Sequence, residues 1–443
     1  MKLAVIADMH HFSRTLGDSG RAFELRSGSD QKCLAETGDI IDATFDMLGS
    51  SDVDAVLIAG DLTNDGETAS HEEMVEKIAL LSKSKPVYVI TSTHDWCNDA
   101  NPRAYRGDSI IHDVPTVDRT ALYGMYKPFT GKEPLSEITT SLGFTSALYE
   151  LGDGVRLLAV CDDKNGEGKA GYPPELLEWI QSCAADAKRD GERIIMMQHH
   201  LLMPGISPLI NGGQCIGDRE QMRDALARAG IEYIFVGHSH MQRVTNYTAD
   251  DGSSITQINV GSLTGHPGAI NIFTIDRYSA ELEVHSVPDF TFNGKTRSAL
   301  YLKEHSLALL EKVFWAGVRD KKEFFDRLSA LGIRAPEQLE KAYPVIRRAC
   351  SLIMTSNVGR LRFLQPFVQD KEAYAQAVYQ LAGEPLFYYV GAIFLNLFDG
   401  TRTVFEPGSP PHTVVTQLAK IPGRLGVGAE LAGEIEKIAE KLI

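Results

Sequence analysis

Histidines and aspartates recur at short spacings in the first 240 residues of the sequence. Asp8-Met9-His10 and His238-Ser239-His240 each separate two such residues by one position, and Gly60-Asp61, Thr93-His94-Asp95 and His199-His200 lie between them. Residues i and i+2 of an extended chain point to the same side, so each spaced pair can present two ligands to one ion. Imidazole nitrogens and carboxylate oxygens without a thiolate suit Mn²⁺, Fe or Zn²⁺. A carboxylate can bridge two such ions about 3.5–4 Å apart, and the ion pair holds a hydroxide for in-line attack on phosphorus.

Each of these groups follows a short apolar run that is typical of a β-strand. Because ligands in open α/β sheets collect beyond the carboxyl ends of the strands, the groups are expected to meet at one edge of a sheet. Gly60 and Gly237 precede Asp61 and His238, and we expect both glycines to let the backbone turn sharply. A lone histidine on a strand usually has a structural role, but here several spacings would have to coincide, so we interpret the set as functional. The apolar runs span residues 3–7, 53–59, 87–91, 194–198 and 233–236.

The first 287 residues alternate apolar runs with amphipathic stretches, a pattern typical of an α/β fold. Asp218-Arg219-Glu220-Gln221 resembles a capping box that opens a helix, which Gly230 ends. From residue 288 onwards apolar residues follow helical spacing instead. We therefore predict two domains, an α/β domain over 1–287 and a mostly α-helical domain over 288–443. Further predicted strands are 155–161, 255–260 and 270–275, and predicted helices are 67–84, 173–190, 298–315, 319–331, 336–355, 371–382, 386–398 and 428–442.

The composition favours an ordinary globular protein without a polyanionic partner. Apolar residues make up 43% and charged residues 23% of the 443 residues, and the net charge is −15. Residues 1–290 hold 24 Lys+Arg against 43 Asp+Glu, whereas residues 291–443 hold 20 against 16. An acidic α/β domain repels a large nucleic acid.

The apolar runs and the cysteines indicate where the protein is located and whether its cysteines form disulfides. The apolar run at 386–398 is shorter than the roughly 20 residues that a membrane span needs. The N-terminal run meets Asp8 too early for a secretory signal. The six scattered cysteines include no C-x-x-C pair, which argues against a disulfide framework. We expect a soluble, cytoplasmic protein with no membrane contact.

The ordered motifs resemble those of the calcineurin-like metallophosphoesterases. Asp8-x-His10, Gly60-Asp61, Thr93-His94-Asp95, His199 and Gly237-His238-Ser239-His240 carry the resemblance, which covers residues 1–285. The stretch 59–72, with Gly-Asp-Leu-Thr-Asn-Asp-Gly-Glu and a trailing Ser-His-Glu, is similar in more detail to a bacterial phosphodiesterase subgroup with a helical C-terminal extension, to which cyclic-nucleotide hydrolysis has been attributed. This resemblance implies an αββα sandwich with two mixed sheets, followed by the helical C-terminal domain.

The resemblance also implies a role for each site residue. Asp8, His10 and His240 would hold one metal ion, His199 and His238 would hold a second, and Asp61 would bridge the two. His94 would sit beside the leaving group as an acid or an electrostatic stabiliser, with Asp95 orienting it. His200 is expected to support the ligands, although adjacent histidines cannot be ranked from sequence.

Thr93 departs from the family pattern. The family usually has Gly-Asn-His-Asp or Gly-Asn-His-Glu at this motif, and the asparagine offers a carbonyl oxygen to the second metal, whereas this chain has Ser92-Thr93-His94-Asp95. A threonine hydroxyl is shorter and donates more weakly to a cation. Thr93 could be a weak ligand of the second metal, could leave the position to a water, or could pack near the site without touching metal.

Two functions are compatible with these residues. The first is hydrolysis of a phosphodiester, such as a cyclic nucleotide, or of a phosphomonoester by a dinuclear metal-bound hydroxide. The alternative is a catalytically weak metal-binding scaffold or regulatory protein whose helical domain binds a partner. A decayed site usually loses several ligands, whereas only one family position has changed here. The helical domain could also cover the cleft or mediate oligomerisation.

Overall fold

The computed structural model describes residues 1–330, 340–426 and 428–443, and the chain divides into two compact units. The first unit comprises residues 1–28 and 32–302, and the second comprises residues 29–31 and 303–443. The domain boundary after residue 287 stays a prediction. Residue 331 of the helix predicted over 319–331, and residues 336–339 of the helix predicted over 336–355, lie outside the described residues.

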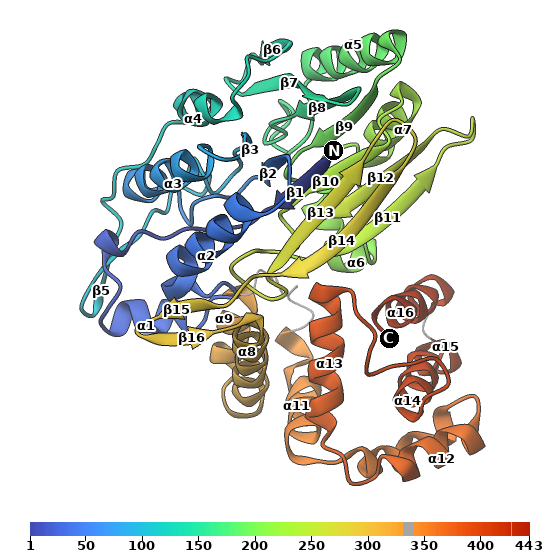
Figure 1. The fold of residues 1–443 in the computed structure, drawn as a ribbon. Helices are drawn as coiled ribbons and strands as arrows, with labels where there is room; N and C mark the ends of the chain where they lie inside the picture. Colours follow the sequence, from blue (N-terminus) through green and yellow to red (C-terminus); the bar gives the residue numbers. More distant parts are fainter. Residues whose placement is uncertain (331–339, 427) are drawn as a thin grey trace. The chain divides into compact units, whose positions relative to one another are not determined.

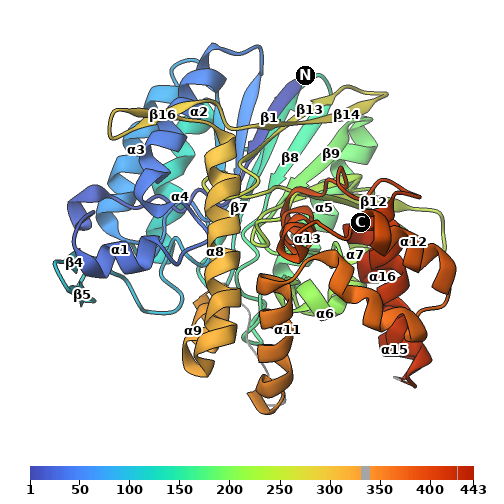
Figure 2. The same cartoon turned by 90° about the horizontal axis from the view of Figure 1, so that it is seen from below.

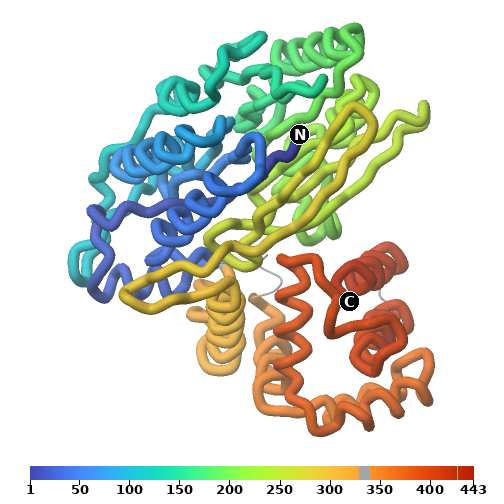
Figure 3. Tube along the Cα trace, viewed as in Figure 1, coloured from blue at the N-terminus to red at the C-terminus, as the bar shows by residue number. Residues whose placement is uncertain are grey.

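Two mixed β-sheets form the centre of the first unit (Figure 1). In the first sheet β1 (Lys2–Ile6) pairs in parallel with β2 (Ala55–Ala59) and antiparallel with β13 (Ala269–Ile275). The hairpin that β13 forms with β14 (Ala280–Ser286) therefore returns beside the N-terminal strand (Figure 3). In the second sheet β8, β9, β10 and β12 run parallel, with antiparallel strands at both edges. All eight predicted strands are present. In spatial order the first sheet is β14 (Ala280–Ser286), β13 (Ala269–Ile275), β1 (Lys2–Ile6), β2 (Ala55–Ala59) and β3 (Val87–Ile90). The second is β11 (Arg243–Thr248), β12 (Ser254–Asn259), β10 (Tyr233–Val236), β9 (Arg193–Met197), β8 (Val155–Ala159), β7 (Thr145–Gly152) and β6 (Ser136–Thr139).

Helices cover the outer face of each sheet, and the sandwich is therefore αββα as predicted. Alternate residues of a strand face opposite sides, so Leu3 and Val5 of β1 join the core between the sheets while Ala4 and Ile6 join the core under the helices. Both faces of the central strands are buried, which explains why they read as continuous apolar runs. The first sheet packs against α2 (Thr37–Ser50) and α3 (Thr68–Leu81), and the second packs against α5 (Pro174–Asp190) and α7 (Arg219–Ala229).

Shorter elements complete the first unit. They are helices α1 (Arg21–Ser27), α4 (Arg119–Tyr126) and α6 (Pro208–Asn211) and the strand pairs β4 (Ala104–Arg106) with β5 (Ser109–Ile111) and β15 (Phe290–Phe292) with β16 (Lys295–Arg297). The capping box predicted at Asp218 does not form. Asp218 lies at the N-cap of α7 in the left-handed region (φ 49°), and its side chain makes no capping hydrogen bond.

The second unit is helical, as predicted (Figure 2). Tyr374 and Val378 pack with Val358 and Val368 in one core, and the Asn396 side chain donates a 2.7 Å hydrogen bond to the Leu442 carbonyl. Within the parts of the chain that the structure describes, no helix combines the length and apolar character that crossing a membrane requires. The helices are α8 (Ala299–Arg319), which begins in the first unit, α9 (Lys321–Ala330), α11 (Tyr343–Thr355), α12 (Lys371–Gln380), α13 (Leu386–Asp399), α14 (Pro410–Ala419), α15 (Ile421–Arg424) and α16 (Ala429–Leu442).

His71 on α3 ties this helix to the chain that follows β3. Its Nε2 lies 2.7 Å from the Asp95 carbonyl oxygen, and its Nδ1 lies 2.7 Å from the Tyr126 hydroxyl. A carbonyl only accepts, so Nε2–H donates and Nδ1 accepts from tyrosine. Burial lowers the pKa of His71 to about 4. The folded state therefore holds His71 neutral.

Acid should destabilise the protein partly through His71. The folded pKa of about 4 lies below the roughly 6.5 of an unfolded histidine, so the unfolded chain binds more protons between these values. This contribution is fully present above pH 6.5 and is lost as the pH falls towards 4, by about 3 kcal/mol at most. His71→Gln keeps a donor and an acceptor but does not titrate, so its unfolding free energy should fall less over this window. Denaturant titrations of both proteins at each pH measure the difference, and parallel pH profiles would contradict it.

Candidate metal centre

Four strand ends, two from each sheet, bring the candidate ligands together. Asp8 and His10 follow β1, Asp61 follows β2, His199 follows β9, and His238 and His240 follow β10. The strands of each pair, β1 with β2 and β9 with β10, are parallel neighbours, so their carboxyl ends coincide. All six side chains predicted to hold metal through an imidazole or a carboxylate thus meet in one site.

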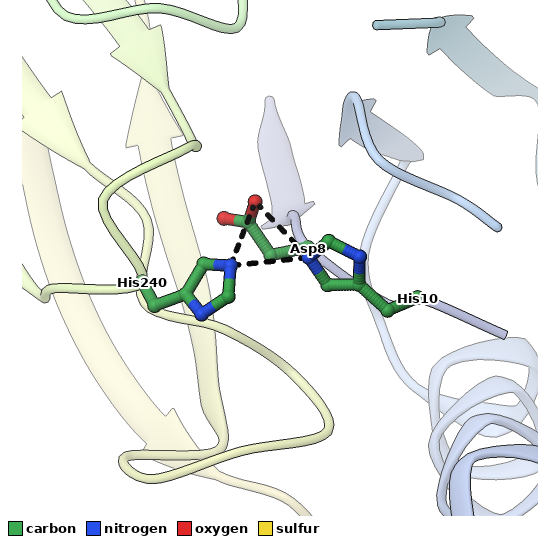
Figure 4. A group of neighbouring side chains, drawn as sticks. All are labelled: Asp8, His10 and His240. Atoms are coloured by element: carbon green, nitrogen blue, oxygen red, sulfur yellow. Dashed lines mark hydrogen bonds and ion pairs between the residues drawn. The ribbon is translucent and has the colours of Figure 1, made fainter. Parts of the chain in front are cut away.

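Asp8, His10 and His240 form the first ligand group (Figure 4). The two imidazole Nε2 atoms are 3.1 Å apart, and Asp8 Oδ1 lies 3.9 Å from His10 Nε2 and 3.6 Å from His240 Nε2. The three side chains point toward one another, Asp8 and His10 from the loop after β1 and His240 from the loop after β10. This is the convergence that a shared cation requires.

Asp61, His199 and His238 form the second group, and Asp61 lies between the two groups. Its Oδ2 atom is 3.1 Å from His199 Nε2 in the second group and 3.8 Å from His10 Nε2 in the first. Its other oxygen accepts a 3.2 Å hydrogen bond from the His94 backbone N–H. One carboxylate therefore faces both groups, as a bridging ligand must.

The backbone is left-handed at five of the six ligand positions. Non-glycine residues rarely adopt positive φ, although aspartate and histidine tolerate it better than most, and such positions cluster at functional sites. Because a left-handed residue turns the chain out of the strand direction, consecutive ligands can converge instead of alternating. The five are Asp8 (52°), His10 (43°), Asp61 (53°), His238 (65°) and His240 (57°).

The two glycines before ligands serve different purposes. Gly60 has a φ of +87°, and a Cβ at this position would lie 2.4 Å from His199 Nδ1. Gly237 does not have a positive φ, although the chain does turn sharply after it, with the Ser239 N–H donating a 2.7 Å hydrogen bond to the Gly237 carbonyl. A Cβ there would lie 2.9 Å from Asp8 Oδ2 and 3.0 Å from the Ala59 carbonyl. Gly237 allows the two sheets' loops to approach closely.

Backbone carbonyls fix the tautomers of two imidazoles. His199 Nδ1 lies 2.8 Å from the Ala59 carbonyl oxygen, and His94 Nδ1 lies 2.5 Å from that of Asn64. Since a carbonyl only accepts, both Nδ1 atoms carry hydrogen. Nε2 of each ring is then the atom that faces the site, and such partners commonly orient metal-binding histidines.

Burial and nearby charges shift the pKa values of the buried groups. Burial lowers the pKa of His10 and of His238 well below the usual imidazole value, which favours the neutral form that coordinates metal. Burial raises the pKa of Asp8 to about 7. Burial acts in the same direction on Asp61, but His199 and His94 outweigh it and hold the pKa of Asp61 well below its usual value. Burial would lower the pKa of His199, but Asp61 and Asp8 raise it well above the ordinary value.

Asp95 does not contact the His94 ring, which differs from the orienting role expected of it. Its buried carboxylate accepts hydrogen bonds from the Thr63 and Ser92 backbone N–H groups, at 2.9 and 2.8 Å. Asp95 therefore fixes the loops that carry Asp61 and His94, because its carboxylate ties one to the other, and the Asn64 carbonyl orients the His94 ring. The ring lies edge-on to His10, with centroids 4.7 Å apart. Thr93 is half-buried beside it, and its carbonyl accepts from the Asn98 N–H at 2.9 Å.

Asp162 and Asp163, just beyond β8, belong to the site's support and were missed in the sequence. Asp162 accepts hydrogen bonds from the backbone N–H groups of His199 and His200, at 3.1 and 2.9 Å. Asp163 accepts from Ser92 Oγ and Trp96 Nε1, both at 2.8 Å, and so reaches the loop of His94. A predicted strand at 155–161 followed directly by two aspartates was the available signal. His200 groups with Asp162 and Asp163, three buried residues that could themselves hold a metal ion, and not with either of the two ligand groups above. Its supporting role stays a prediction.

The residues present fit a pair of metal ions. Asp8 Oδ2 is buried without a hydrogen-bond partner, and the donors are imidazole and carboxylate groups throughout. Buried carboxylates are costly unless a cation or hydrogen bonds offset their charge. The donor set is compatible with Mn²⁺, Fe or Zn²⁺.

An αββα sandwich with histidines and aspartates converging at its strand ends defines a candidate dinuclear metallohydrolase. A model of the calcineurin-like phosphoesterases matches residues 1–242, more than half of the sequence. The chain belongs to the calcineurin-like phosphoesterase family. This family uses a dinuclear metal centre, so membership supports metal-dependent hydrolysis of phosphoesters. No curated protein sequence matches the chain.

Solved structures resemble the fold at low sequence identity. A dimetal phosphatase from Danio rerio is 13% identical, with 65% of this chain and 99% of that chain covered and a TM-score of 0.46. A putative 5'-nucleotidase from Staphylococcus aureus is 12% identical, with 81% and 59% covered and a TM-score of 0.38. The NAD nucleotidase of Haemophilus influenzae is 12% identical, with 81% and 61% covered and a TM-score of 0.36.

Replacing Gly60 by alanine should weaken metal binding at the second ligand group. The new Cβ would collide with the His199 ring, in addition to the strain of a positive φ. Gly230→Ala is the matched control, since Gly230 has a similar φ of +92° with no atom within 4 Å of the added Cβ. Elemental analysis after dialysis against limiting Mn²⁺ should find fewer ions in Gly60→Ala only. Equal metal contents would show that His199 tolerates the intrusion.

Proposed function

We propose that this chain hydrolyses a small phosphoester, with a phosphodiester such as a cyclic nucleotide as the first choice. The position of Asp61 Oδ2, 3.1 Å from His199 Nε2 and 3.8 Å from His10 Nε2, carries the proposal. A carboxylate that faces two separate ligand groups has little use in a site for one ion. Two ions held in this way polarise phosphoryl oxygens and lower the pKa of a bound water.

In this proposal Asp8, His10 and His240 hold one ion, and His199 and His238 hold the other. Asp61 is shared between them. Thr93 is proposed as a weak ligand of the second ion, because it occupies the family's asparagine position. Mn²⁺, Fe and Zn²⁺ are the proposed metals, since the donors are nitrogen and oxygen only.

His94 is proposed to assist departure of the leaving group. Its Nδ1–H is committed to the Asn64 carbonyl at 2.5 Å, and its side chain is only partly buried. A protonated His94 can therefore present Nε2–H to an oxygen of the substrate, as an acid or as a stabiliser of negative charge. The Asp61 carboxylate, which accepts from the His94 N–H at 3.2 Å, keeps the residue close to the ligand groups.

A small substrate fits the acidic first unit better than a large nucleic acid does. Residues 1–290 hold 24 Lys+Arg against 43 Asp+Glu, and this excess repels an extended polyanion. We also propose a cytoplasmic location, and a helical domain from residue 288 that covers the cleft or mediates association.

A catalytically weak metal-binding protein is the second candidate, and Thr93 is the observation that favours it. The loss of a carbonyl ligand would lower the affinity for the second ion. The surrounding ligands are all retained, however, so hydrolysis is the function that the site supports better.

Chelation should separate these two candidates. Purified protein with Mn²⁺ should hydrolyse bis(p-nitrophenyl) phosphate, EDTA should abolish the reaction, and added Mn²⁺ should restore it. The melting temperature should fall with EDTA, because an ion that binds only the folded state stabilises it. Two bound ions and a metal-dependent melting temperature without turnover would identify the scaffold. Full turnover without metal would contradict both. A panel of cyclic nucleotides, linear diesters and monoesters then ranks the substrate classes.

Thr93→Asn should tighten binding of the second ion. An added carbonyl ligand is worth about 1–3 kcal/mol by analogy with a charged group left under-satisfied, which is about five- to 150-fold in affinity. Half-saturation by Mn²⁺ should move to lower concentration, and turnover at limiting Mn²⁺ should rise. Thr93→Val, which removes only the hydroxyl, is the control for packing. Identical titrations of wild type and Thr93→Asn would mean that the residue does not face the metal.

A further inference from the structure

A cavity of about 860 Å³ lies beside the second ligand group and is lined at one side by His200 and His238. Its other walls come from residues 169–170, the loop 212–217 and the first turn of α7. The Gly217 N–H donates a 2.8 Å hydrogen bond to the Ala170 carbonyl and so joins two of these walls. The volume is in the range of small-molecule sites, and His238 places it next to the proposed reaction centre.

Two cationic side chains, Lys169 and Arg219, line this cavity. Among the described residues neither has a carboxylate oxygen within 4.0 Å of its nitrogen atoms. The backbone holds Lys169 in place, since Asn165 N donates to its carbonyl at 2.9 Å and Asn165 Oδ1 accepts from its N–H at 3.3 Å. Arg219 lies in the first turn of α7. Both charges are therefore available to a ligand.

The start of α7 also suits negative charge. His200 contributes less, because its Nδ1 lies 3.4 Å from the buried Asp162 Oδ1 and so faces a carboxylate. Asp218 offers no side-chain cap to α7, so the positive end of an 11-residue helix faces the cavity without an internal acceptor. Asp218 and Glu220 also line the cavity, but both are exposed and neither pairs with the two cations.

We propose that this cavity binds a second phosphate group of the substrate, distinct from the phosphate that is hydrolysed. The inference rests on the proposed function and selects within it the phosphoesters that carry a further phosphate, which a cyclic mononucleotide does not. Lys169 and Arg219 supply charge-assisted hydrogen bonds, and the α7 N-terminus supplies N–H groups. Apart from the imidazoles of His200 and His238, the described lining includes no aromatic ring, so it offers a nucleobase little to stack on.

A matched substrate pair tests this selection on the full-length protein with Mn²⁺. Thymidine 5'-(p-nitrophenyl phosphate) and its 3'-phosphorylated form release the same chromophore from the same diester. Wild type should prefer the 3'-phosphorylated form by about tenfold or more in kcat/KM, as one charge-assisted contact commonly gives. Arg219→Met and Lys169→Met should each reduce this ratio several-fold, and Arg219→Lys should retain part of it. Lys188→Met removes an exposed charge from α5 outside the cavity and should leave the ratio unchanged.

The possible outcomes distinguish failure of the cavity assignment from failure of the proposed function. Hydrolysis of both substrates with equal kcat/KM would overturn the cavity assignment and leave the proposed function standing. A preference that survives both methionine substitutions would overturn the assignment as well. If neither substrate is hydrolysed, bis(p-nitrophenyl) phosphate and the panel of esters decide whether the proposed function fails, and calorimetric titration of the Mn²⁺-containing protein decides the cavity alone. Thymidine 3',5'-bisphosphate should then bind about tenfold more tightly than thymidine 5'-monophosphate, with the same dependence on Arg219 and Lys169, and equal binding would overturn the inference.

Discussion

The burial of two carboxylates in one site, Asp8 and Asp61, is the constraint on which the rest of the structure depends. Asp8 is fully buried and Asp61 is 1% exposed, and His199 Nε2 lies 4.0 Å from Asp8 Oδ1 and 3.1 Å from Asp61 Oδ2. One imidazolium offsets only one of the two charges, and burial accordingly raises the pKa of Asp8 to about 7. Cations held by this donor set would offset both, because paired charges are the form in which buried carboxylates are stable. The arrangement of the site therefore suits bound cations.

Residues that hold no metal position those that would. The Ser262 and Thr264 hydroxyls donate to the carbonyls of Asp8 and Met9, both at 2.9 Å, and fix the chain that leaves β1. Gln257 on β12 accepts from the N–H groups that follow His199-His200, those of Leu202 and Met203, at 2.8 and 2.7 Å. The bonds from Ser262 and Thr264 lie at the left-handed Asp8 and beside the left-handed His10, a backbone conformation that is adopted only when its surroundings determine it. The Gln257 bonds fix the chain that follows His199 and His200. Hydrogen bonds to the backbone of the loops thus help to bring together the ligands from the two sheets.

The candidate metal centre and the adjoining cavity draw on different loops. The loops after β1, β2, β9 and β10 supply ligands, whereas residues 169–170 and the start of α7 line the cavity. Binding energy from a part of the substrate that does not react can position the part that does. His238 belongs to the second ligand group and also lines the cavity. A substrate group bound in the cavity would therefore lie next to the second ligand group.

Local pattern determined the central strands, helices such as α3, α5 and α13, and the strand ends at which histidines and aspartates gather, because buried strands read as apolar runs. The family resemblance, not the pattern alone, implied which of these residues hold metal, and helices such as α2 and α14 were not predicted. The β11 and β14 edge strands were not predicted, since their exposed faces carry polar residues such as Arg243 and Glu281. Only the tertiary structure decided that the Asp95 carboxylate accepts hydrogen bonds from the Thr63 and Ser92 backbone N–H groups. It also decided that Gly237 lets the loops of the two sheets approach closely, and that the Asp162 carboxylate accepts from the His199 N–H. Each of these depends on contacts between strands or loops distant in sequence. Spacing shows which residues can meet at a sheet edge, whereas the partner of each polar atom follows from how the two sheets pack.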